Sequence, residues 1–297
     1  MEKETSTGSI SSQDNLLPSL RVDTRTRLII SAAVAGGRAR LVGSRAPKAE
    51  RISAKLNGVE GLGERLLCLF DMDGVLYNSM PNHAIAWVQA MASYGIRFTE
   101  ADSYATEGAR GVDTVRRFVK EQTGKDISEE EAMEMYQEKA RIFGTLPVAE
   151  VMPGAKQLMQ KIKAQGLTIG VVTGSAQRPL IARILEDFSE FITEDHIVTA
   201  YDVKRGKPNP DPYLMGMRKC SPRVEVRGER LEVREFMPEE TIVVENAPLG
   251  IRAGKAAGAY TIAVNTGPLP DETLLEAGAD VLFSSMQELA DAWPITE

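Results

Sequence analysis

The sequence has little cysteine, no long apolar run and no excess of basic residues. Two cysteines in 297 residues are too few for a disulfide framework, and Cys68 lies within an apolar run, where a buried, reduced thiol is expected. No apolar run approaches the roughly 20 residues that a membrane-spanning helix needs. The formal net charge of −7 argues against a nucleic-acid surface, where a basic patch is expected. We therefore expect a cytoplasmic protein that binds neither membranes nor nucleic acid, and we favour a monomer.

Residues 1–64 differ in composition from the rest of the chain. The stretch "TSTGSISSQDN" is polar and rich in serine, which is typical of disordered chain. The range 21–48 carries seven basic residues and one acid and faintly resembles a transit sequence, although two glutamates stand among the first four residues. We predict a disordered N-terminal extension, with a targeting role and a docking segment as the alternatives.

From residue 65 onward, short apolar runs alternate with helical stretches. This order is typical of a parallel sheet with crossover helices. The runs lack strict alternation, as expected when helices cover both faces of the sheet. The pattern therefore predicts an α/β fold with a Rossmann-like parallel sheet. The predicted strands are Leu66–Phe70, Thr168–Thr173, His196–Thr199, Thr241–Glu245, Tyr260–Asn265 and Asp280–Phe283.

About a hundred residues separate the first two predicted strands, far more than one crossover helix needs. Trp87, Val88 and Met91 recur there at helical spacing and predict an apolar stripe in a small core. We assign 65–79 and 151–297 to the sheet-containing core and 80–150 to an inserted helical cap. The predicted helices are Pro81–Tyr94, Val112–Gln122, Ser128–Phe143 with a capping box, and Gly154–Gln165 after the cap. A second insertion, Val224–Glu235, alternates around a central Arg-Gly and predicts an exposed β-hairpin.

Polar side chains follow several of the predicted strands. In open parallel sheets, ligands bind beyond the carboxyl ends of the strands, so these side chains are expected to meet at one edge. That expectation explains why an apolar strand is followed by two aspartates one residue apart. The residues at this edge are Asp71, Asp73, Thr173, Gly174, Ser175, Glu245 and Asn246, with Lys207 in the loop after the third predicted strand.

Four segments, in this order, resemble the four motifs of the haloacid dehalogenase-like phosphohydrolase superfamily. They are "DMDGVLYNS", "VVTGS", "GKPNPDPY" and "VVENAPLGIRAGKAAG". The resemblance covers residues 65–293 and implies a mobile helical cap between the first and second motifs. The chain looks most similar to the β-phosphoglucomutase-like group. The segments "NSMPNHAIAW", "TAYDVKRGKPNPDPYLM" and "NTGPLPD" resemble a bacterial branch of that group that contains phosphatases and an inorganic pyrophosphatase.

The resemblance implies a division of labour between the two aspartates. A phosphate ester or anhydride repels an anionic nucleophile, so phosphoryl transfer needs an in-line nucleophile, a metal and fixed cations. Asp71 is expected to form an aspartyl-phosphate. Asp73, two residues further along and on the same face, is expected to act as general acid and then as general base. Lys207 would supply fixed positive charge. The dehalogenases of the superfamily lack the second aspartate, so Asp73 disfavours carbon–halogen chemistry.

The expected metal is Mg²⁺, which takes oxygen ligands in octahedral geometry. The resemblance implies the Asp71 carboxylate and the Asp73 backbone carbonyl as ligands. The third ligand is usually an aspartate, whereas this chain has Asn246, which brings no charge. We hypothesise that Glu245 or the cap residue Glu107 compensates. A cap glutamate would complete the site only on closure and would favour a small substrate such as pyrophosphate.

Further residues are candidates for substrate binding. Thr173, Gly174 and Ser175 suit phosphoryl oxygens through hydroxyl and backbone N–H donors, although they can also cap the following helix. His83 matches a histidine that assists proton transfer in β-phosphoglucomutase-like proteins, and packing against Trp87 is its alternative. Arg110 in the cap is a candidate phosphate ligand or a solvated side chain.

The sequence therefore predicts an Mg²⁺-dependent hydrolase of a small phosphorylated substrate, either a sugar phosphate or pyrophosphate. The first alternative is an isomerase that moves phosphate between two hydroxyls of a hexose, because the same four motifs serve it. The second is a catalytically silent module that binds a phosphorylated ligand, against which the intact pair of aspartates argues.

Overall fold

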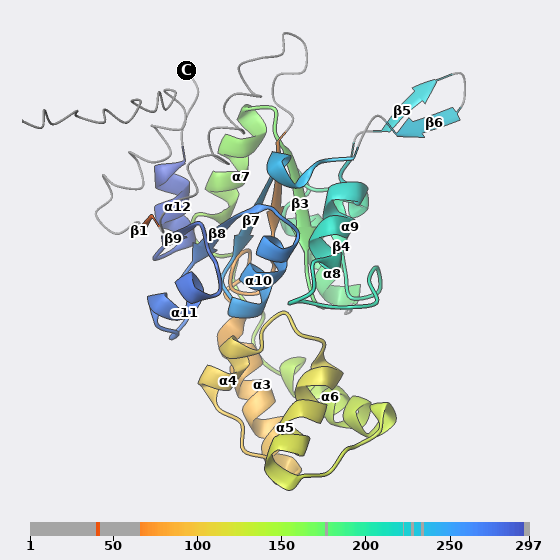
Figure 1. The fold of residues 1–297 in the computed structure, drawn as a ribbon, viewed down its shortest axis with the longest axis vertical. Helices are drawn as coiled ribbons and strands as arrows, with labels where there is room; N and C mark the ends of the chain where they lie inside the picture. The colour runs from red at the N-terminus through yellow and green to blue at the C-terminus, as the bar shows by residue number, and fades with distance from the viewer. Residues whose placement is uncertain are drawn as a thin grey trace, which may run out of the picture.

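The core of the molecule is a seven-stranded sheet with the order β1-β9-β8-β7-β2-β3-β4 (Figure 1). The computed structural model describes residues 40–41, 66–175, 178–221, 223–226, 229–232 and 235–293. All neighbouring strands are parallel except β1 and β9, so the predicted α/β fold with a parallel sheet is confirmed. The strands are β1 Arg40–Leu41, β2 Leu67–Phe70, β3 Thr168–Val172, β4 Ile197–Val198, β7 Thr241–Glu245, β8 Tyr260–Val264 and β9 Val281–Phe283.

Helices cover both faces of the sheet, and the side chains of β2 show how. Cys68 and Phe70 face one layer, while Leu67 and Leu69 face the other. Each buried Leu or Phe stabilises the fold by about 1.5–3 kcal/mol, which explains why this strand is apolar throughout. The first layer contains α7 Ala155–Ala164, α8 Arg178–Asp187 and α12 Met286–Ala292; the second contains α9 Asp211–Lys219, α10 Pro248–Ala256 and α11 Asp271–Glu276.

The cap is a separate group of helices inserted after β2 (Figure 1). Its centre is aromatic, with ring centroids 5.5 Å apart for Trp87 and Phe98 and 4.6 Å apart for Phe98 and Phe118. Val88 does not belong to this core, because it lies on the flank of its helix and is 36% exposed. The helices are α3 Met80–Ser93, α4 Glu100–Ala105, α5 Gly111–Thr123 and α6 Glu129–Phe143. The capping box of Ser128 at the start of α6 is confirmed, whereas the six-residue α4 was not predicted.

Two chain passages connect the core and the cap. The Asn78 backbone N–H donates to the Glu150 carbonyl oxygen at 2.9 Å, and the Met152 N–H donates to the Leu76 carbonyl oxygen at 2.8 Å. The passages therefore lie side by side at the carboxyl end of β2.

Several segments deviate from or extend the predicted pattern. His196 closes a 3-10 turn, Glu194–His196, instead of beginning β4. Within residues 1–64, Arg40–Leu41 form β1 at the sheet edge, and the expectation for the rest of that range lies outside the described residues. The predicted hairpin is confirmed as β5 Arg223–Val226 paired antiparallel with β6 Glu229–Glu232, and it projects away from the core (Figure 1). Across the described ranges, no helix is both long and apolar enough to span a bilayer.

Candidate active site

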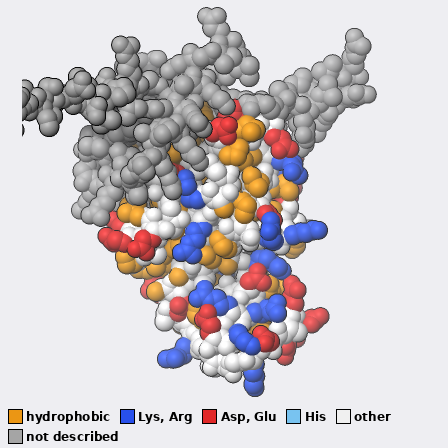
Figure 2. Space-filling model, viewed as in Figure 1, with side chains coloured by type: hydrophobic (Ala, Val, Ile, Leu, Met, Phe, Trp, Pro, Cys, Tyr) orange, Lys and Arg blue, Asp and Glu red, His pale blue; other side chains and the backbone are white. Residues whose placement is uncertain are grey.

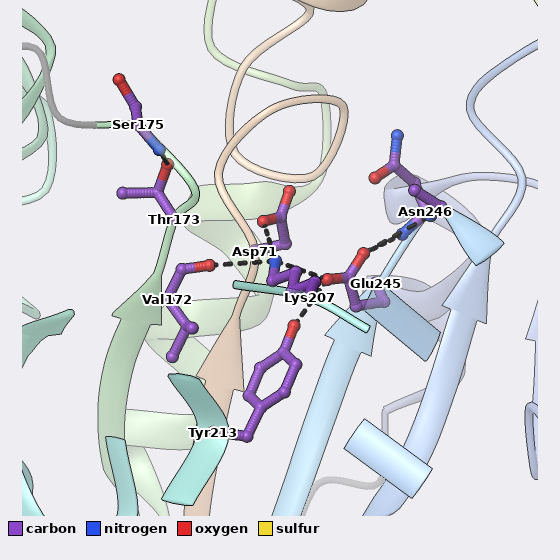
Figure 3. Close-up of polar contacts among 9 residues, drawn as sticks. Asp71, Val172, Thr173, Ser175, Lys207, Tyr213, Glu245 and Asn246 are labelled. Atoms are coloured by element: carbon purple, nitrogen blue, oxygen red, sulfur yellow. Dashed lines mark hydrogen bonds and ion pairs between the residues drawn. The ribbon is translucent and has the colours of Figure 1, made fainter. Parts of the chain in front are cut away.

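The carboxyl ends of β2, β3 and β7 converge on one buried group of charged side chains (Figure 3). Lys207 Nζ donates to Asp71 Oδ1 at 2.5 Å, to Glu245 Oε1 at 2.6 Å and to the Val172 carbonyl oxygen at 3.2 Å. Burial lowers the pKa of the Lys207 ammonium, but Asp71 and Glu245 raise it well above its ordinary value. The lysine therefore stays charged and links residues from all three strands.

Both oxygens of Glu245 are engaged by the chain itself. Oε1 accepts hydrogen bonds from Lys207 and, at 2.5 Å, from the hydroxyl of Tyr213. Oε2 lies 3.1 Å from the Asn246 backbone N–H and 3.4 Å from that of Ala247. Glu245 is thus fixed by four donors at the end of β7 (Figure 3).

Asp71 Oδ2 and both side-chain polar atoms of Asn246 are buried and lack a hydrogen-bond partner. Asn246 sits against Gly74, where an added Cβ would lie 2.0 Å from the amide nitrogen, so only glycine leaves room for this approach. Leaving buried polar atoms without a partner costs about 1–3 kcal/mol each, so a ligand is expected here. Among the residues that the structure describes, no three His, Cys, Asp or Glu side chains form a closed cluster for a metal. The unpaired carboxylate oxygen of Asp71 and the unpaired amide oxygen of Asn246 nevertheless are the kind of oxygen ligand that Mg²⁺ takes.

A second polar group surrounds Asp73. Asp73 Oδ1 accepts a hydrogen bond from Ser79 Oγ at 2.5 Å and lies 3.1 Å from His83 Nε2. The other ring nitrogen of His83 is 2.7 Å from Lys139 Nζ. Asp73 is therefore connected through His83 to a lysine of the cap helix α6.

This second group determines the ionisation of Asp73. Burial raises the pKa of the Asp73 carboxyl, whereas the charge and hydrogen bond of His83 lower it. Ser79 and Lys139 lower it further, so the pKa of Asp73 lies below its usual value. Burial also lowers the pKa of Lys139, to about 8.

Around Lys207, the buried carboxyl groups outnumber the buried ammonium group. Burial raises the pKa of Asp71 well above its usual range; Lys207 opposes that shift, while Glu245, Glu107 and then Asp73 add to it. Burial likewise raises the pKa of Glu107, and the charge of Asp73 adds to that rise. A divalent cation among these carboxylates would relieve their mutual repulsion.

The loop 106–110 of the cap packs directly onto the core. Gly108 has a φ of +83°, and a Cβ there would lie 2.7 Å from Lys207 Cδ. A Cβ on Gly174 would lie 3.2 Å from the Gly108 carbonyl oxygen. On another side of the site, Tyr104 of α4 packs on Gly267, where a Cβ would lie 2.5 Å from the ring. The cap is therefore closed over the strand ends.

Closure leaves little space beside the second motif. Thr173, Gly174, Arg110 and Lys207 line a cavity of about 10 Å³, close to the space of one water molecule. The Ser175 backbone N–H donates to Thr173 Oγ1 at 3.0 Å, which shapes the loop (Figure 3).

An open groove of about 350 Å³ lies beyond this cavity, between the cap and the loop 204–209. Lys and Arg atoms are visible where the cap meets the core (Figure 2). Arg110 lines both spaces, although its guanidinium also contacts Glu129 at 2.9 Å. The basic residues in the groove lining are Arg110, Arg117, Lys204, Arg205 and Lys207.

The predicted site residues lie in the two buried polar groups or beside the small cavity: Asp71, Lys207, Glu245 and Asn246 in the first group, Asp73 and His83 in the second, Thr173, Gly174 and Arg110 at the cavity, Ser175 next to Thr173, and Glu107 close enough to act on the charge of Asp71. Three neighbours were not predicted. Lys139 shares the buried face of α6 with Met135 and Ile142, so a lysine at apolar helical spacing was the available signal. Ser79 lies within the first motif but carried no distinctive pattern. Tyr213 ends the third motif and has the spacing of an ordinary core residue of α9.

Comparison with known proteins assigns the family. Residues 66–258 match the sequence model of the haloacid dehalogenase-like hydrolase family. The chain belongs to this family. The hydrolase is 30% identical over 216 residues to a phosphorylated carbohydrates phosphatase of Thermotoga maritima, covering 72% of this chain and 92% of that protein. It is 29% identical over 221 residues to hexitol phosphatase A of Escherichia coli, covering 74% and 91%.

A solved structure also matches the hydrolase closely. It comes from Bacteroides vulgatus, and its given name proposes a β-phosphoglucomutase. The TM-score is 0.70 at 43% identity, with 84% of this chain and 96% of that chain covered. The predicted resemblance to the β-phosphoglucomutase-like group is therefore confirmed, and the hydrolase is an enzyme of the α/β class with a helical cap.

Proposed function

We propose that this hydrolase releases phosphate from a small phosphorylated metabolite through an aspartyl-phosphate on Asp71, with Mg²⁺ as cofactor. The observation that carries the proposal is the contact between Asp71 and Lys207 beside the unpaired atoms of Asp71 and Asn246. That arrangement offers a nucleophile, a fixed cation and an oxygen-lined metal site in one buried place. The family match and the phosphatase relatives support the same reaction class.

The first step joins Asp71 to phosphorus. Asp71 Oδ1, beside Lys207, attacks; a new P–O bond forms, and the bond from phosphorus to the leaving oxygen breaks. Lys207 offsets the charge on the transferring group, which is the main demand of phosphoryl transfer. Thr173 and the backbone of the loop after β3 would hold the phosphoryl oxygens.

The second step hydrolyses the aspartyl-phosphate and regenerates the free Asp71 carboxylate. Asp73 removes a proton from water, the water oxygen attacks phosphorus, and the bond to Asp71 breaks to give inorganic phosphate. The lowered pKa of Asp73 keeps its carboxylate ionised, so it has room for the proton that the water loses. For the acid role in the first step, the proton would be shared with His83, whose Nε2 lies 3.1 Å from Asp73 Oδ1.

Mg²⁺ would be held by Asp71 Oδ2, Asn246 Oδ1 and the Asp73 carbonyl oxygen, and when bound it would supply positive charge to the phosphoryl oxygens. Glu245 is fully occupied by four donors, so we assign it to holding Lys207 and not to the metal. Glu107 remains the candidate for a ligand from the cap. The raised pKa of Glu107 is consistent with a buried carboxyl group whose charge a bound cation would stabilise.

A phosphorylated sugar or polyol is the first candidate substrate, because the named relatives act on phosphorylated carbohydrates. Pyrophosphate is the second. A phosphate leaving group needs less proton donation than a sugar alkoxide, which matches the lowered pKa of Asp73. The small cavity beside Thr173 and the position of Glu107 also favour a compact substrate.

The test is phosphate release by the full-length protein from hexitol, hexose and glycerol phosphates and from pyrophosphate, with Mg²⁺ or with a chelator. We expect turnover of at least one substrate, dependence on Mg²⁺, and loss of turnover in Asp71→Asn. Asp195→Asn, an exposed aspartate of the 3-10 turn at the amino end of β4, is the matched control and should retain activity. Conversion of β-glucose 1-phosphate to glucose 6-phosphate without phosphate release would instead establish the isomerase.

A further inference from the structure

We propose that Tyr213 is a positioning residue for Lys207, acting through Glu245. The inference rests on the proposed function, in which Lys207 is catalytic. Tyr213 is fully buried beneath the site and belongs to α9, whereas Glu245 ends β7 and Lys207 lies in the loop before α9. One hydrogen bond therefore ties the helix to the last residue of β7, which Asn246 directly follows.

The geometry concentrates two donors on one oxygen. Glu245 Oε1 accepts from Lys207 Nζ at 2.6 Å and from the Tyr213 hydroxyl at 2.5 Å, while Lys207 Nζ also reaches Asp71 Oδ1 at 2.5 Å (Figure 3). The ammonium group lies 5.3 Å from the centre of the Tyr213 ring, so the aromatic face also limits where it can move. Lys207 is thus shared between two carboxylates, one of which already has a neutral donor.

Removing the Tyr213 hydroxyl changes how Lys207 is shared between Asp71 and Glu245. Glu245 Oε1 would keep only Lys207 as its donor, and a buried carboxylate with fewer donors attracts a neighbouring cation more strongly. Lys207 would move toward Glu245 and away from Asp71 and the transferring phosphoryl group. The hydroxyl of Tyr213 therefore keeps the ammonium group available to the nucleophile.

The first experiment compares Tyr213→Phe with the wild type on the best substrate of the panel. Loss of a partner that orients a catalytic group typically costs about 10- to 100-fold in activity, so we expect kcat to fall in that range. KM should change less than kcat, because the lysine stabilises transferring charge more than ground-state binding. Tyr260→Phe, which removes the hydroxyl of the half-buried tyrosine that begins β8, is the matched control and should leave kcat unchanged. A wild-type kcat in Tyr213→Phe would overturn the inference while leaving the proposed function intact.

The second experiment asks whether Tyr213 acts through Glu245. If it does, Tyr213→Phe should have little further effect on kcat in a Glu245→Gln background, because the two changes interrupt the same connection. Independent, multiplicative losses would show that Tyr213 acts by another route and would overturn the inference.

A readout without turnover completes the test and does not require the Phe variant to fold. 3-Fluorotyrosine placed at 213 keeps the hydroxyl, so kcat should stay near the wild-type value. Its ¹⁹F resonance should shift when Glu245→Gln is introduced and should not shift with Glu235→Gln, an exposed control. An unchanged resonance in Glu245→Gln would contradict the contact on which the inference depends.

Discussion

At the scale of the residue, Lys139 is a buried cap lysine whose positive charge is disfavoured by burial. It is 2% exposed, and burial lowers its pKa from 10.5 to about 8. The folded protein therefore binds this proton more weakly than the unfolded chain, and unfolding takes up a proton between about pH 8 and pH 10.5. Stability contributed by this residue rises with pH across that window, by about 3 kcal/mol in total. Denaturant unfolding measures this effect: the free energy of unfolding of the wild type, relative to that of Lys139→Met, should increase as the pH is raised from about 7 to about 10.

Arg141→Met is the control for that measurement, since Arg141 lies on the same helix but is exposed and paired with Glu138. The difference in free energy of unfolding between Arg141→Met and the wild type should be the same at every pH. A constant difference between the wild type and Lys139→Met would show that the folded protein accommodates the charge without penalty.

The residues of the site divide into those that a sequence can reveal and those that it cannot. Asp71, Thr173 and Lys207 follow strands in recognisable motifs, so their meeting at one edge follows from parallel topology. Tyr213 could not be assigned, because a tyrosine in an apolar helix position has the same pattern whether or not its hydroxyl finds a carboxylate. That distinction depends on the packing of α9 against β7, which no local pattern encodes.

At the scale of the element, the loop 106–110 of the cap contacts Lys207, the lysine that we propose to be catalytic. Gly108→Ala would place a methyl group 2.7 Å from Lys207 Cδ in a backbone conformation with φ of +83°. Because small displacements of reacting groups cost about 10²-fold in rate, we expect kcat/KM to fall at least tenfold. Steady-state kinetics on the best substrate measures this effect.

Gly124→Ala is the control that distinguishes the clash with Lys207 from the strain of a positive φ. Gly124 has a φ of +73° at the end of α5, and a methyl group added there would have nothing within 4 Å, so this variant suffers the strain alone. It should lose about 1–2 kcal/mol of stability and keep its kcat/KM. Equal kinetic losses in the two variants would mean that the loop does not need close contact with Lys207.

The elements themselves were largely predictable from their local patterns. The parallel strands are continuous apolar runs, and α6 begins at a capping box, so their bounds agree with expectation within about two residues. The six-residue α4 was missed because it is too short to show helical periodicity. Val88 was wrongly predicted to belong to the cap core, because its position next to Trp87 in the helix puts it at the edge of the buried face.

At the scale of the whole molecule, the hairpin β5–β6 projects away from the sheet and from the candidate active site (Figure 1). Its two ends are held together below it, where the Phe236 backbone N–H donates to Ser221 Oγ at 3.0 Å. Replacing residues 223–234 by two glycines should therefore leave kcat and KM unchanged, because short exposed loops close at low entropic cost. A fall in kcat with an unchanged melting temperature would assign the hairpin a part in the reaction.

The two passages between core and cap, 76–79 and 147–152, restrict how a cap that opens would move. A body held by two adjacent, hydrogen-bonded tethers has little freedom to slide and turns about one axis. For a cap that turns in this way, we expect Glu107, Lys139 and Tyr104 to reach the core together. One angle would then set the local charge, the water content and the free volume beside Asp71.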